Sequence, residues 1–541
     1  MFQIISLIIL IKVRLWIFIA IYRYNSEGEI LLLCFFLNSM SMLQRIESMN
    51  WLSSQRIAML ITVVAVLFMA VHSIAFFSAT DYMPADPDET IFYNSARNFF
   101  VNTSVKSVTM QEELTARIGG ANWYGPAYSL LYGIPAKLFG FGNKYWIFFN
   151  FIFIVAALFV ISMMPVGERS RWFYAAVLLL FNVTQIFVFT WNPEIFNLLL
   201  GLILCLFLFR IAESGRGKWL FVLLCFLFSF FRITWIFWAA GLLPFMGTRR
   251  KQVLYGAGFV FMLMLAFAYV QLFCAPFLVT AGGIGKELAT LHFGAAAADF
   301  VKTFARNVYY FFYRELMVTP MWFAVKMVFI FLLFMLLHSA WRRRNRLVVS
   351  AAMIVMISLL VLFGMYQMTM PYVMKITGSL VLLVFFVTLR TGGRQHVAAI
   401  LISLLWAFPF AQRHAIVTIK AHVTAAERMN NDYRNMVAAL RSIPALMDHN
   451  TDQYVMFADY ELQPMPFPLF LCILPVSDGR GHLIRYTANR IDPRKPVADT
   501  YKFFDRLPVK FIISRTSLIR PDLELLEQNA YFSFYHRKAG S

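Results

Sequence analysis

Long apolar segments recur along most of this chain, and they constrain its fold more than any other feature. Each is close to the roughly 20 residues that an α-helix needs to cross a bilayer. They cover residues 57–77, 144–165, 171–190, 193–211, 253–274, 321–340, 347–366, 372–389 and 397–410. Apolar residues make up 60% of the 541 residues and charged residues only 14%, whereas soluble domains carry about 25% charged residues. The composition excludes an ordinary soluble, disordered, collagen-like or coiled-coil protein and predicts an all-α polytopic membrane protein.

The basic residues gather in short clusters between these runs. The formal net charge is +20, a value that on its own would suggest a nucleic-acid partner. The clusters, however, lie at 167–171, 213–218, 247–251, 341–346 and 391–394. That distribution is typical of cytoplasmic loops under the positive-inside rule. We therefore expect membrane lipid, and no nucleic acid, beside these loops.

Two segments do not fit a simple count of spans, 124–141 and the 27 residues of 219–245. The long acidic loop 79–123 is expected on the outer side. If 124–141 crossed the membrane, or if 219–245 were a single span, at least one basic cluster would lie outside as well. Both conflicts vanish when 124–141 is a re-entrant or interfacial outer segment and 219–245 is a short helical hairpin.

The resulting prediction is a transmembrane domain over 51–415 with about 11 spans and with outer loops 79–143 and 275–320. Residues 1–50 contain apolar stretches that are broken or too short to span. We expect them to be an upstream extension of the reading frame or a cytoplasmic N-terminal segment.

The C-terminal segment 416–541 has a different pattern. Apolar residues recur at helical spacing over 429–443. Around 511–513 and 532–534 they alternate as they do in strands. We predict a small extracytoplasmic α/β domain.

Three carboxylates lie within four residues shortly after the first apolar run: Asp86, Asp88 and Glu89. Carboxylates this close repel one another unless a cation, a substrate hydroxyl or a metal meets them, so they are candidate catalytic or binding groups. The alternative is a solvated loop in which an Asp caps the helix that begins near Glu89.

Glu194 and Arg232 are the next candidates. Glu194 follows Trp-Asn-Pro at the predicted outer start of run 193–211, although Pro and Glu also suit the first turn of any helix. Arg232 is centred among apolar residues, where a charge costs about 2.5–3.5 kcal/mol on insertion scales. It is therefore expected to face a cavity or an anionic ligand at the tip of the hairpin, or else to extend to the interface.

Further cations lie in the other predicted outer segments. Arg306 and Arg314 flank Tyr310 at four-residue spacing, which places all three on one helix face. Binding of a phosphate head group and simple anchoring in the interface both fit this aromatic stretch. Tyr372 and Lys375 open run 372–389 at the predicted outer face, where Lys375 alternatively extends to the interface.

Metal, disulfide and hydrolase chemistry find no support in the sequence. The five cysteines form no CxxC pair, and the nine histidines form neither HxxxH nor HExxH. We therefore predict no metal site and no cofactor. No internal repeat is evident, which argues against an inverted-repeat transporter.

Taken in order, these motifs resemble those of the GT-C class of integral-membrane glycosyltransferases, in particular the lipid A aminoarabinose transferase and bacterial protein O-mannosyltransferase-like family. The segment DPDETIFY at 86–93 resembles the family's Pro-Asp-Glu-x-x-x-Tyr signature. WYGPAYSLLYGIPAKLFG, WNPEIFNLLL, FFRITWIFWAAGLLPF and MPYVMKITGSL are similar to four further segments. The chain departs from the pattern at Asn192, where an Asp often sits, and in having a single Pro in WYGP.

The resemblance implies an activity. Such enzymes take a sugar from a polyprenyl-phosphate carrier at the outer face of the cell (inner) membrane and transfer it to an envelope glycan, lipid or protein. An in-line displacement would invert the anomeric centre. Relatives of this type generally manage with cationic side chains, so no cofactor is implied, although a divalent metal stays an option.

The resemblance also implies roles for the candidate residues. The acceptor hydroxyl needs a base, for which Asp88 is the candidate, while Glu89 or Glu194 would orient the acceptor or Asp88. Arg232 would take up the charge that develops on the leaving phosphate. The other substrate-binding residues expected are Asp86, Tyr93, Tyr124, Arg306, Arg314, Tyr372 and Lys375.

Two other functions stay open at this point, a lipid-linked glycan flippase or transporter and a non-catalytic assembly subunit of an envelope complex. A transporter predicts acidic and basic residues in mid-membrane along several spans. Here the carboxylates gather at the predicted outer ends of the spans.

Overall fold

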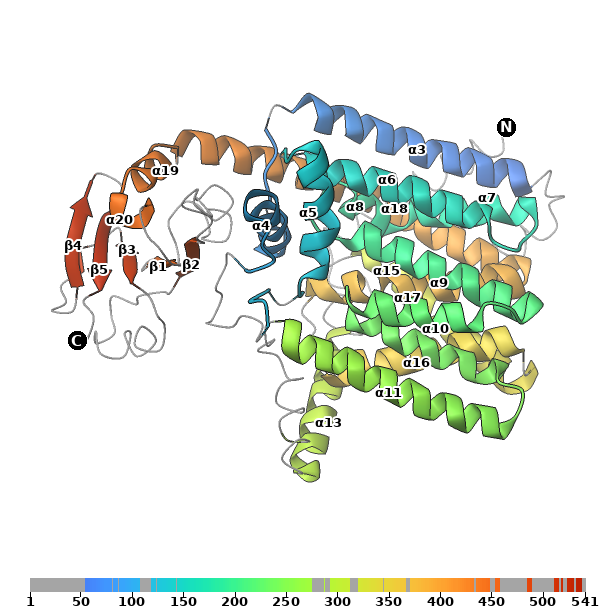
Figure 1. Cartoon of the computed structure of the whole chain (residues 1–541). Helices are drawn as coiled ribbons and strands as arrows, with labels where there is room; N and C mark the ends of the chain where they lie inside the picture. The colour runs from blue at the N-terminus through green and yellow to red at the C-terminus, as the bar shows by residue number, and fades with distance from the viewer. Residues whose placement is uncertain are drawn as a thin grey trace.

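The structure, a computed structural model, describes residues 54–79, 81–85, 87–107, 118–122, 124–142, 144–274, 287, 292–311, 320–343, 345–365, 370–432, 434–447, 453–457, 484–488, 510–514, 517–518, 523–529 and 532–537. Within these residues, a bundle of apolar helices has short helices lying across one end, and a small β-sheet lies beyond that end (Figure 1). The predicted N-terminal segment 1–50 lies outside the described residues.

The bundle confirms the predicted all-α polytopic architecture. Its helices are α3 (Ser54–Ser78), α6 (Tyr145–Ser162), α7 (Glu168–Leu180), α8 (Asn182–Phe187), α9 (Glu194–Ser214), α10 (Lys218–Ser229), the 3₁₀ helix η1 (Ile233–Phe245), α11 (Arg249–Phe273), α15 (Pro320–Arg343), α16 (Arg346–Met365), α17 (Met370–Thr391) and α18 (Arg394–Asp432). In the described part of the chain, six helices are long and apolar enough to cross a membrane; α6, α7, α10, η1 and α17 contain shorter apolar helical stretches. The number of about 11 spans stays a prediction.

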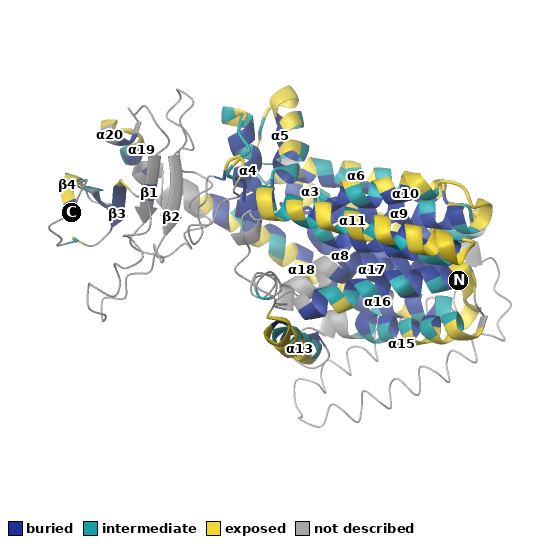
Figure 2. Cartoon of the chain, turned by 60° about the horizontal axis from the view of Figure 1, so that its bottom comes forward, coloured by how far each residue is buried: buried dark blue, intermediate teal, exposed yellow. Residues whose placement is uncertain are grey.

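The outermost helices expose apolar side chains. Leu67 and Val71 on α3 and Val253 and Leu254 on α11 are all exposed. Figure 2 shows exposed surface along α11, whereas α17 is mostly buried in the interior of the bundle. Exposed apolar side chains on helices of this length fit a lipid environment. Apolar surface has no hydration penalty there, and a helix forms all its backbone hydrogen bonds internally.

Residues 219–245 form the helical hairpin that the sequence predicts. Helix α10 and η1 pack against each other, and the chain turns between them at Phe230–Arg232. A hydrogen bond also joins the open ends of the hairpin, where Lys218 Nζ donates to the Phe245 carbonyl at 2.8 Å. Arg232 is therefore at the tip of the hairpin.

Helices α4 (Pro87–Asn102) and α5 (Ala127–Phe139) lie at one end of the bundle. α4 begins with Pro at its first position, where the missing N–H is not needed. α5 runs across the direction of the long helices (Figure 1), and its 13 residues span only about 20 Å. This short transverse helix agrees with the predicted re-entrant or interfacial segment 124–141, and its position relative to the membrane stays a prediction.

The last bundle helix continues past the end of its apolar run. α18 is unbroken for 39 residues, so the predicted domain boundary at 416 falls inside a helix, and the helix does not stop at Phe410. The reason is local, because the sequence between Pro409 and Pro444 contains neither Gly nor Pro, the residues that most disfavour a helix. α19 (Arg434–Arg441) and α20 (Pro444–Met447) follow.

The C-terminal strands form the small sheet that was predicted. Its strands are β1 (Gln453–Phe457), β2 (Ile484–Ala488), β3 (Phe511–Ser514), β4 (Leu523–Gln528) and β5 (Ser533–Arg537), in the order β2-β1-β3-β5-β4. β1 is parallel to β2 and β3, whereas β5 is antiparallel to β3 and β4. The predicted strands around 511–513 and 532–534 are confirmed as β3 and β5; an extracytoplasmic location stays a prediction.

Candidate active site

Four segments that are distant in sequence meet at the end of the bundle near α4 and α5. They are the link 79–85 before α4, the link 188–193 before α9, the tip of the α10–η1 hairpin, and α18 near residue 422. Tyr82 joins the first two, because its hydroxyl donates a 2.7 Å hydrogen bond to the Phe189 carbonyl. Asn150 of α6 also fixes the second link, donating to the carbonyls of Phe187, Val188 and Thr190 at 3.3, 3.2 and 2.9 Å.

Glu89 is paired with His422 in the interior of this site. Glu89 Oε2 and His422 Nε2 are 2.7 Å apart, and both side chains are only 2% exposed. The same carboxylate accepts hydrogen bonds from the backbone N–H of Ala85 at 3.1 Å and from Asn192 Nδ2 at 3.4 Å. A buried carboxylate needs such partners, because an unpaired charge in the interior is very costly.

The hydrogen bonds of His422 show that this pair shares a proton. Its Nδ1 lies 2.6 Å from the Thr418 carbonyl, and since a carbonyl can only accept, Nδ1 carries a hydrogen. The contact between Nε2 and Glu89 then needs a second proton, which resides on either the imidazole or the carboxyl group. In both cases the net charge of the pair is zero.

Aromatic rings enclose the pair. The Tyr82 ring stacks on the His422 ring with centroids 4.8 Å apart and an interplanar angle of 12°. The centroid of the Trp191 ring lies 5.4 Å from that of the His422 ring. Tyr93 packs edge-on against Trp191 at 5.8 Å. Burial raises the pKa of Tyr82 well above its ordinary value, and the Glu89 carboxylate raises it further. Tyr82 therefore stays protonated and acts as a hydrogen-bond donor.

Glu194 and Arg232 form the second ion pair. Arg232 Nη2 and Nη1 donate to the two carboxylate oxygens at 2.7 and 3.2 Å, the bidentate geometry that suits guanidinium and carboxylate. Glu194 begins α9, where the positive end of the helix dipole also favours a carboxylate. Arg232 has an extended backbone conformation at the hairpin tip, just before η1.

Tyr128 of α5 lies beside the second pair. Its hydroxyl is 3.2 Å from Asn197 Oδ1 and 3.1 Å from Asn197 Nδ2, and its ring packs edge-on against Phe231. Burial raises the pKa of Tyr128 to about 12, and the charges of Arg232 and Glu194 act on it in opposite directions. The hydroxyl is therefore neutral at physiological pH. Through Tyr128 the layer of short helices contacts both the α10–η1 tip and the start of α9.

The other predicted residues lie at different places. Asp88 is in the first turn of α4, next to Glu89, and its side chain lies outside the described part. Tyr93 is buried against Trp191, and Tyr124 is half-buried with its ring 4.4 Å from Phe92. The backbones of Tyr372 and Lys375 belong to α17, with side chains that are not described, and Asp86 and Arg314 lie wholly outside the described residues.

Arg306 is on α13 (Phe293–Tyr309), away from the two ion pairs in the contacts described. Its Nε and Nη2 are buried and have no hydrogen-bond partner in the described structure. Asn307, the next residue, donates to the Phe363 carbonyl at 2.7 Å and ties α13 to α16.

Sequence reasoning did not single out His422 or the bridging role of Asn192. A signal for His422 was available, because Ala415, Ile419, His422 and Ala426 repeat at helical spacing and all are buried. A histidine on an otherwise apolar helix face needs a partner inside the protein. In the described residues, no group of three or more His, Cys, Asp or Glu side chains is arranged to hold a metal ion.

Comparison with known proteins adds the following. No family model and no curated protein matches the chain. Among solved structures, it is similar to ArnT from Cupriavidus metallidurans bound to undecaprenyl phosphate, with 11% identity, a TM-score of 0.42, and coverage of 88% of this chain and 99% of that chain. It is also similar to the oligosaccharyltransferase of Archaeoglobus fulgidus in complex with zinc and sulfate, with 12% identity, a TM-score of 0.47, and coverage of 84% and 67%. Both are GT-C glycosyltransferases, the class that the sequence motifs resemble.

Proposed function

We propose that this protein is a membrane glycosyltransferase. It would move a sugar from a polyprenyl-phosphate carrier to an envelope glycan, lipid or protein at the extracytoplasmic face of the cell (inner) membrane. The observation that carries the proposal is that Glu89, Glu194 and Arg232, each selected from the sequence on its own, are linked at one end of the bundle through Asn192 and the Glu194–Arg232 pair. Carboxylates and a fixed cation are the groups that transfer from a lipid phosphate requires.

Asp88 is the proposed general base. Glu89, next to it, already accepts hydrogen bonds from Ala85 and Asn192 and pairs with His422. In this proposal these contacts hold the first turn of α4 in place. In the proposed reaction the acceptor hydroxyl attacks C1 of the sugar and gives its proton to Asp88. The bond between C1 and the phosphate oxygen breaks, its electron pair leaves with the phosphate, and attack from the opposite side inverts the anomeric centre.

Arg232 is the proposed cation for the leaving phosphate. The guanidinium donates two hydrogen bonds to Glu194, a bidentate contact that fixes the position of its charge. In this proposal Glu194 orients the guanidinium before substrate binds, so that little reorganisation accompanies the growth of negative charge on the phosphate. Tyr128 and Asn197 support the orientation from the side of α5 and α9.

Transfer by the purified protein tests the proposal. The protein is reconstituted in vesicles, supplied with a panel of polyprenyl-phosphate sugars and envelope acceptors, and the product and its anomeric configuration are determined by mass spectrometry and NMR. Asp88→Asn is expected to lower kcat by about 10²–10⁴-fold, the usual contribution of a general base, while the midpoint of thermal unfolding stays unchanged. Near-normal turnover would remove Asp88 from the mechanism.

Glu427→Gln is the matched control, because Glu427 is an exposed carboxylate on α18 beyond His422 and should leave turnover unchanged. If no sugar is transferred from any donor but lipid-linked glycans cross the vesicle membrane, the protein is a flippase. If neither transfer nor crossing occurs, the assembly-subunit function is favoured.

A further inference from the structure

A cavity of about 350 Å³ lies at the end of the bundle opposite the candidate active site. It is bounded by the last turns of α9, α15 and α17 and the first turn of α16. α9 begins at Glu194 in the candidate site and ends at Ser214 near the cavity, so its 21 residues separate the two places by about 30 Å. By the positive-inside rule this end of the bundle faces the cytoplasm.

Arg390 supplies a cation to this cavity. Its Nη1 is buried and has no hydrogen-bond partner in the described structure, and among the described residues no carboxylate forms a salt bridge with it. The guanidinium is 5.0 Å from the centroid of the Phe209 ring, a contact that stabilises the charge without neutralising it. A partly buried cation without a counter-ion favours the entry of an anion.

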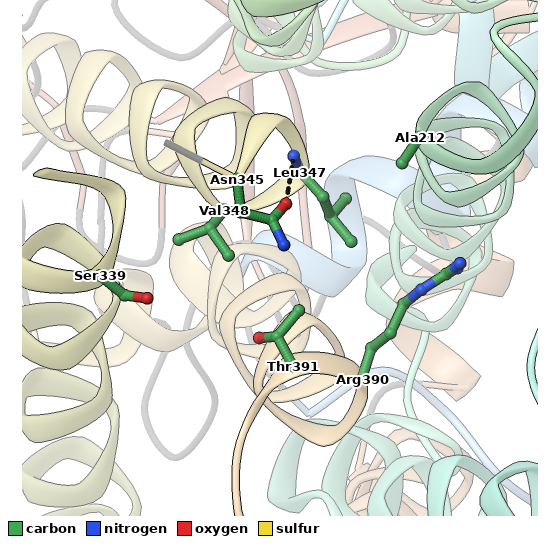
Figure 3. Close-up of a pocket in the computed structure, with 7 residues that line it drawn as sticks. All are labelled: Ala212, Ser339, Asn345, Leu347, Val348, Arg390 and Thr391. Carbon is green, nitrogen blue, oxygen red and sulfur yellow. Dashed lines mark hydrogen bonds between the residues drawn. The ribbon is translucent and has the colours of Figure 1, made fainter. Parts of the chain in front are cut away.

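Hydrogen-bond donors face Arg390 across the cavity. Asn345 caps α16, accepting the Leu347 N–H at 3.0 Å with its Oδ1, so its amide nitrogen is directed elsewhere. Figure 3 shows Asn345 and Thr391 on either side of the space between α16 and α17, with Arg390 extending towards Ala212. Apart from Leu347, whose N–H donates to Asn345, the first-turn N–H groups of α16 lack intrahelical acceptors and add the positive end of the helix dipole.

Two of the segments that border the cavity are strongly basic. Segments 339–348 and 390–394 contain arginines but no Asp or Glu. Arg346 and Arg394 are exposed and close in sequence to residues that line the cavity, where they raise the local concentration of anions. The cavity is at the lower end of the size range of ligand pockets, which suits a head group better than a larger molecule.

We infer that this cavity binds a phosphate group, supplied by the head group of an anionic phospholipid in the cytoplasmic leaflet. Arg390 meets the charge, and Asn345 together with the first turn of α16 donates hydrogen bonds to the phosphate oxygens. The site is separate from the proposed transfer reaction, and it does not depend on that proposal. A free phosphate is the other source of the same chemistry.

The test follows the midpoint of thermal unfolding of the full-length protein in neutral detergent. The protein is titrated separately with phosphatidylglycerol, with phosphatidylcholine and, at constant ionic strength, with inorganic phosphate. Phosphatidylglycerol is expected to raise the midpoint in a saturable way, and phosphatidylcholine is not. Saturable protection by inorganic phosphate alone would overturn the lipid source and assign the cavity to a soluble phosphate.

Two variants tie the effect to the cavity. Arg390→Gln is expected to weaken the apparent affinity for phosphatidylglycerol at least tenfold. Asn345→Asp keeps a good N-cap for α16 but places a carboxylate at the cavity, and it should weaken binding by a similar factor. It also keeps the test decisive if Arg390→Gln fails to fold.

Arg342→Gln is the matched control, because it removes an exposed arginine nearby that does not line the cavity, and it should change the affinity less than twofold. The inference is overturned if both cavity variants bind as the wild type does. It is equally overturned if phosphatidylcholine protects as well as phosphatidylglycerol, or if neither lipid nor phosphate shifts the midpoint.

Discussion

Glu89 and His422 illustrate at the residue scale why a polar pair inside this protein must stay complete. Both side chains are 2% exposed, so neither can recover hydration if the other is removed. Breaking a buried pair on one side typically costs about 3–5 kcal/mol, because a charge or polar group is left uncompensated. Replacing both partners by neutral groups costs much less.

His422→Ala is therefore expected to lower the free energy of unfolding by about 3–5 kcal/mol. In the double variant Glu89→Gln/His422→Ala, the total loss should be clearly smaller than the sum of the two single losses. Thermal unfolding of the four proteins in detergent gives the coupling. Losses that add within about 0.5 kcal/mol would mean that the two side chains do not interact.

The Glu194–Arg232 pair allows stability and activity to be separated. Arg232→Gln should destabilise the protein by about 3–5 kcal/mol, because Glu194 stays buried without its cation. Glu194→Gln/Arg232→Gln removes both charges and should recover most of that stability. If Arg232 binds the leaving phosphate, sugar transfer stays lost in the stable double variant; recovered transfer would instead make the pair purely structural.

At the scale of elements, the position of α4 depends on how closely α5 approaches it. Gly133 of α5 permits the approach, because an added Cβ would lie 2.6 Å from Cβ of Phe99 on α4. That contact is to the rigid base of the side chain, so relief requires the two helices to separate. The acidic motif is in the first turn of α4, and a shift of this helix moves it.

Gly133→Ala is expected to destabilise the protein by about 1–3 kcal/mol through overpacking, and to lower sugar transfer, since small displacements of catalytic groups are costly. Gly142→Ala is the control, because nothing lies within 4 Å of a Cβ at that position. Unfolding midpoints and turnover of both variants provide the measurement. Equal behaviour of the two variants would show that the contact between α4 and α5 is not tight.

At the scale of the whole molecule, the bundle has a candidate active site at one end and the cavity that contains Arg390 at the other. The buried helix α9 connects the two ends, and α18 connects the bundle with the C-terminal sheet (Figure 1). The charge asymmetry along this axis predicts how the molecule is inserted in the membrane.

Site-directed labelling checks that orientation. With the natural Cys34 and Cys472 replaced by Ser, Lys106→Cys should react with a membrane-impermeant maleimide on intact cells. Arg216→Cys should react only after permeabilisation, because Arg216 is at the opposite end of the bundle. The described native cysteines, Cys205, Cys225 and Cys274, are buried and give little background. Labelling of both positions from the same side would contradict the topology.

Particular features show how far the sequence could go. The 219–245 hairpin was predictable because a hairpin there, together with a segment 124–141 that does not cross, keeps every basic cluster on one side of a bilayer. Glu194 and Arg232 could be selected because charges among apolar residues need partners. The continuation of α18 to Asp432 was not predicted. The apolar run ends near Phe410, but the residues that follow it still favour a helix.

The sequence alone determined that this chain enters a membrane, that residues 219–245 form a hairpin and which of its polar residues are candidates for function, because these depend on hydropathy and charge along the chain. Only the tertiary structure decided the partners. Glu89 and His422 are 333 positions apart, and Glu194 and Arg232 are 38 apart. Which charges meet depends on how the helices pack, and burial then makes each pairing necessary by removing the water that would otherwise satisfy it.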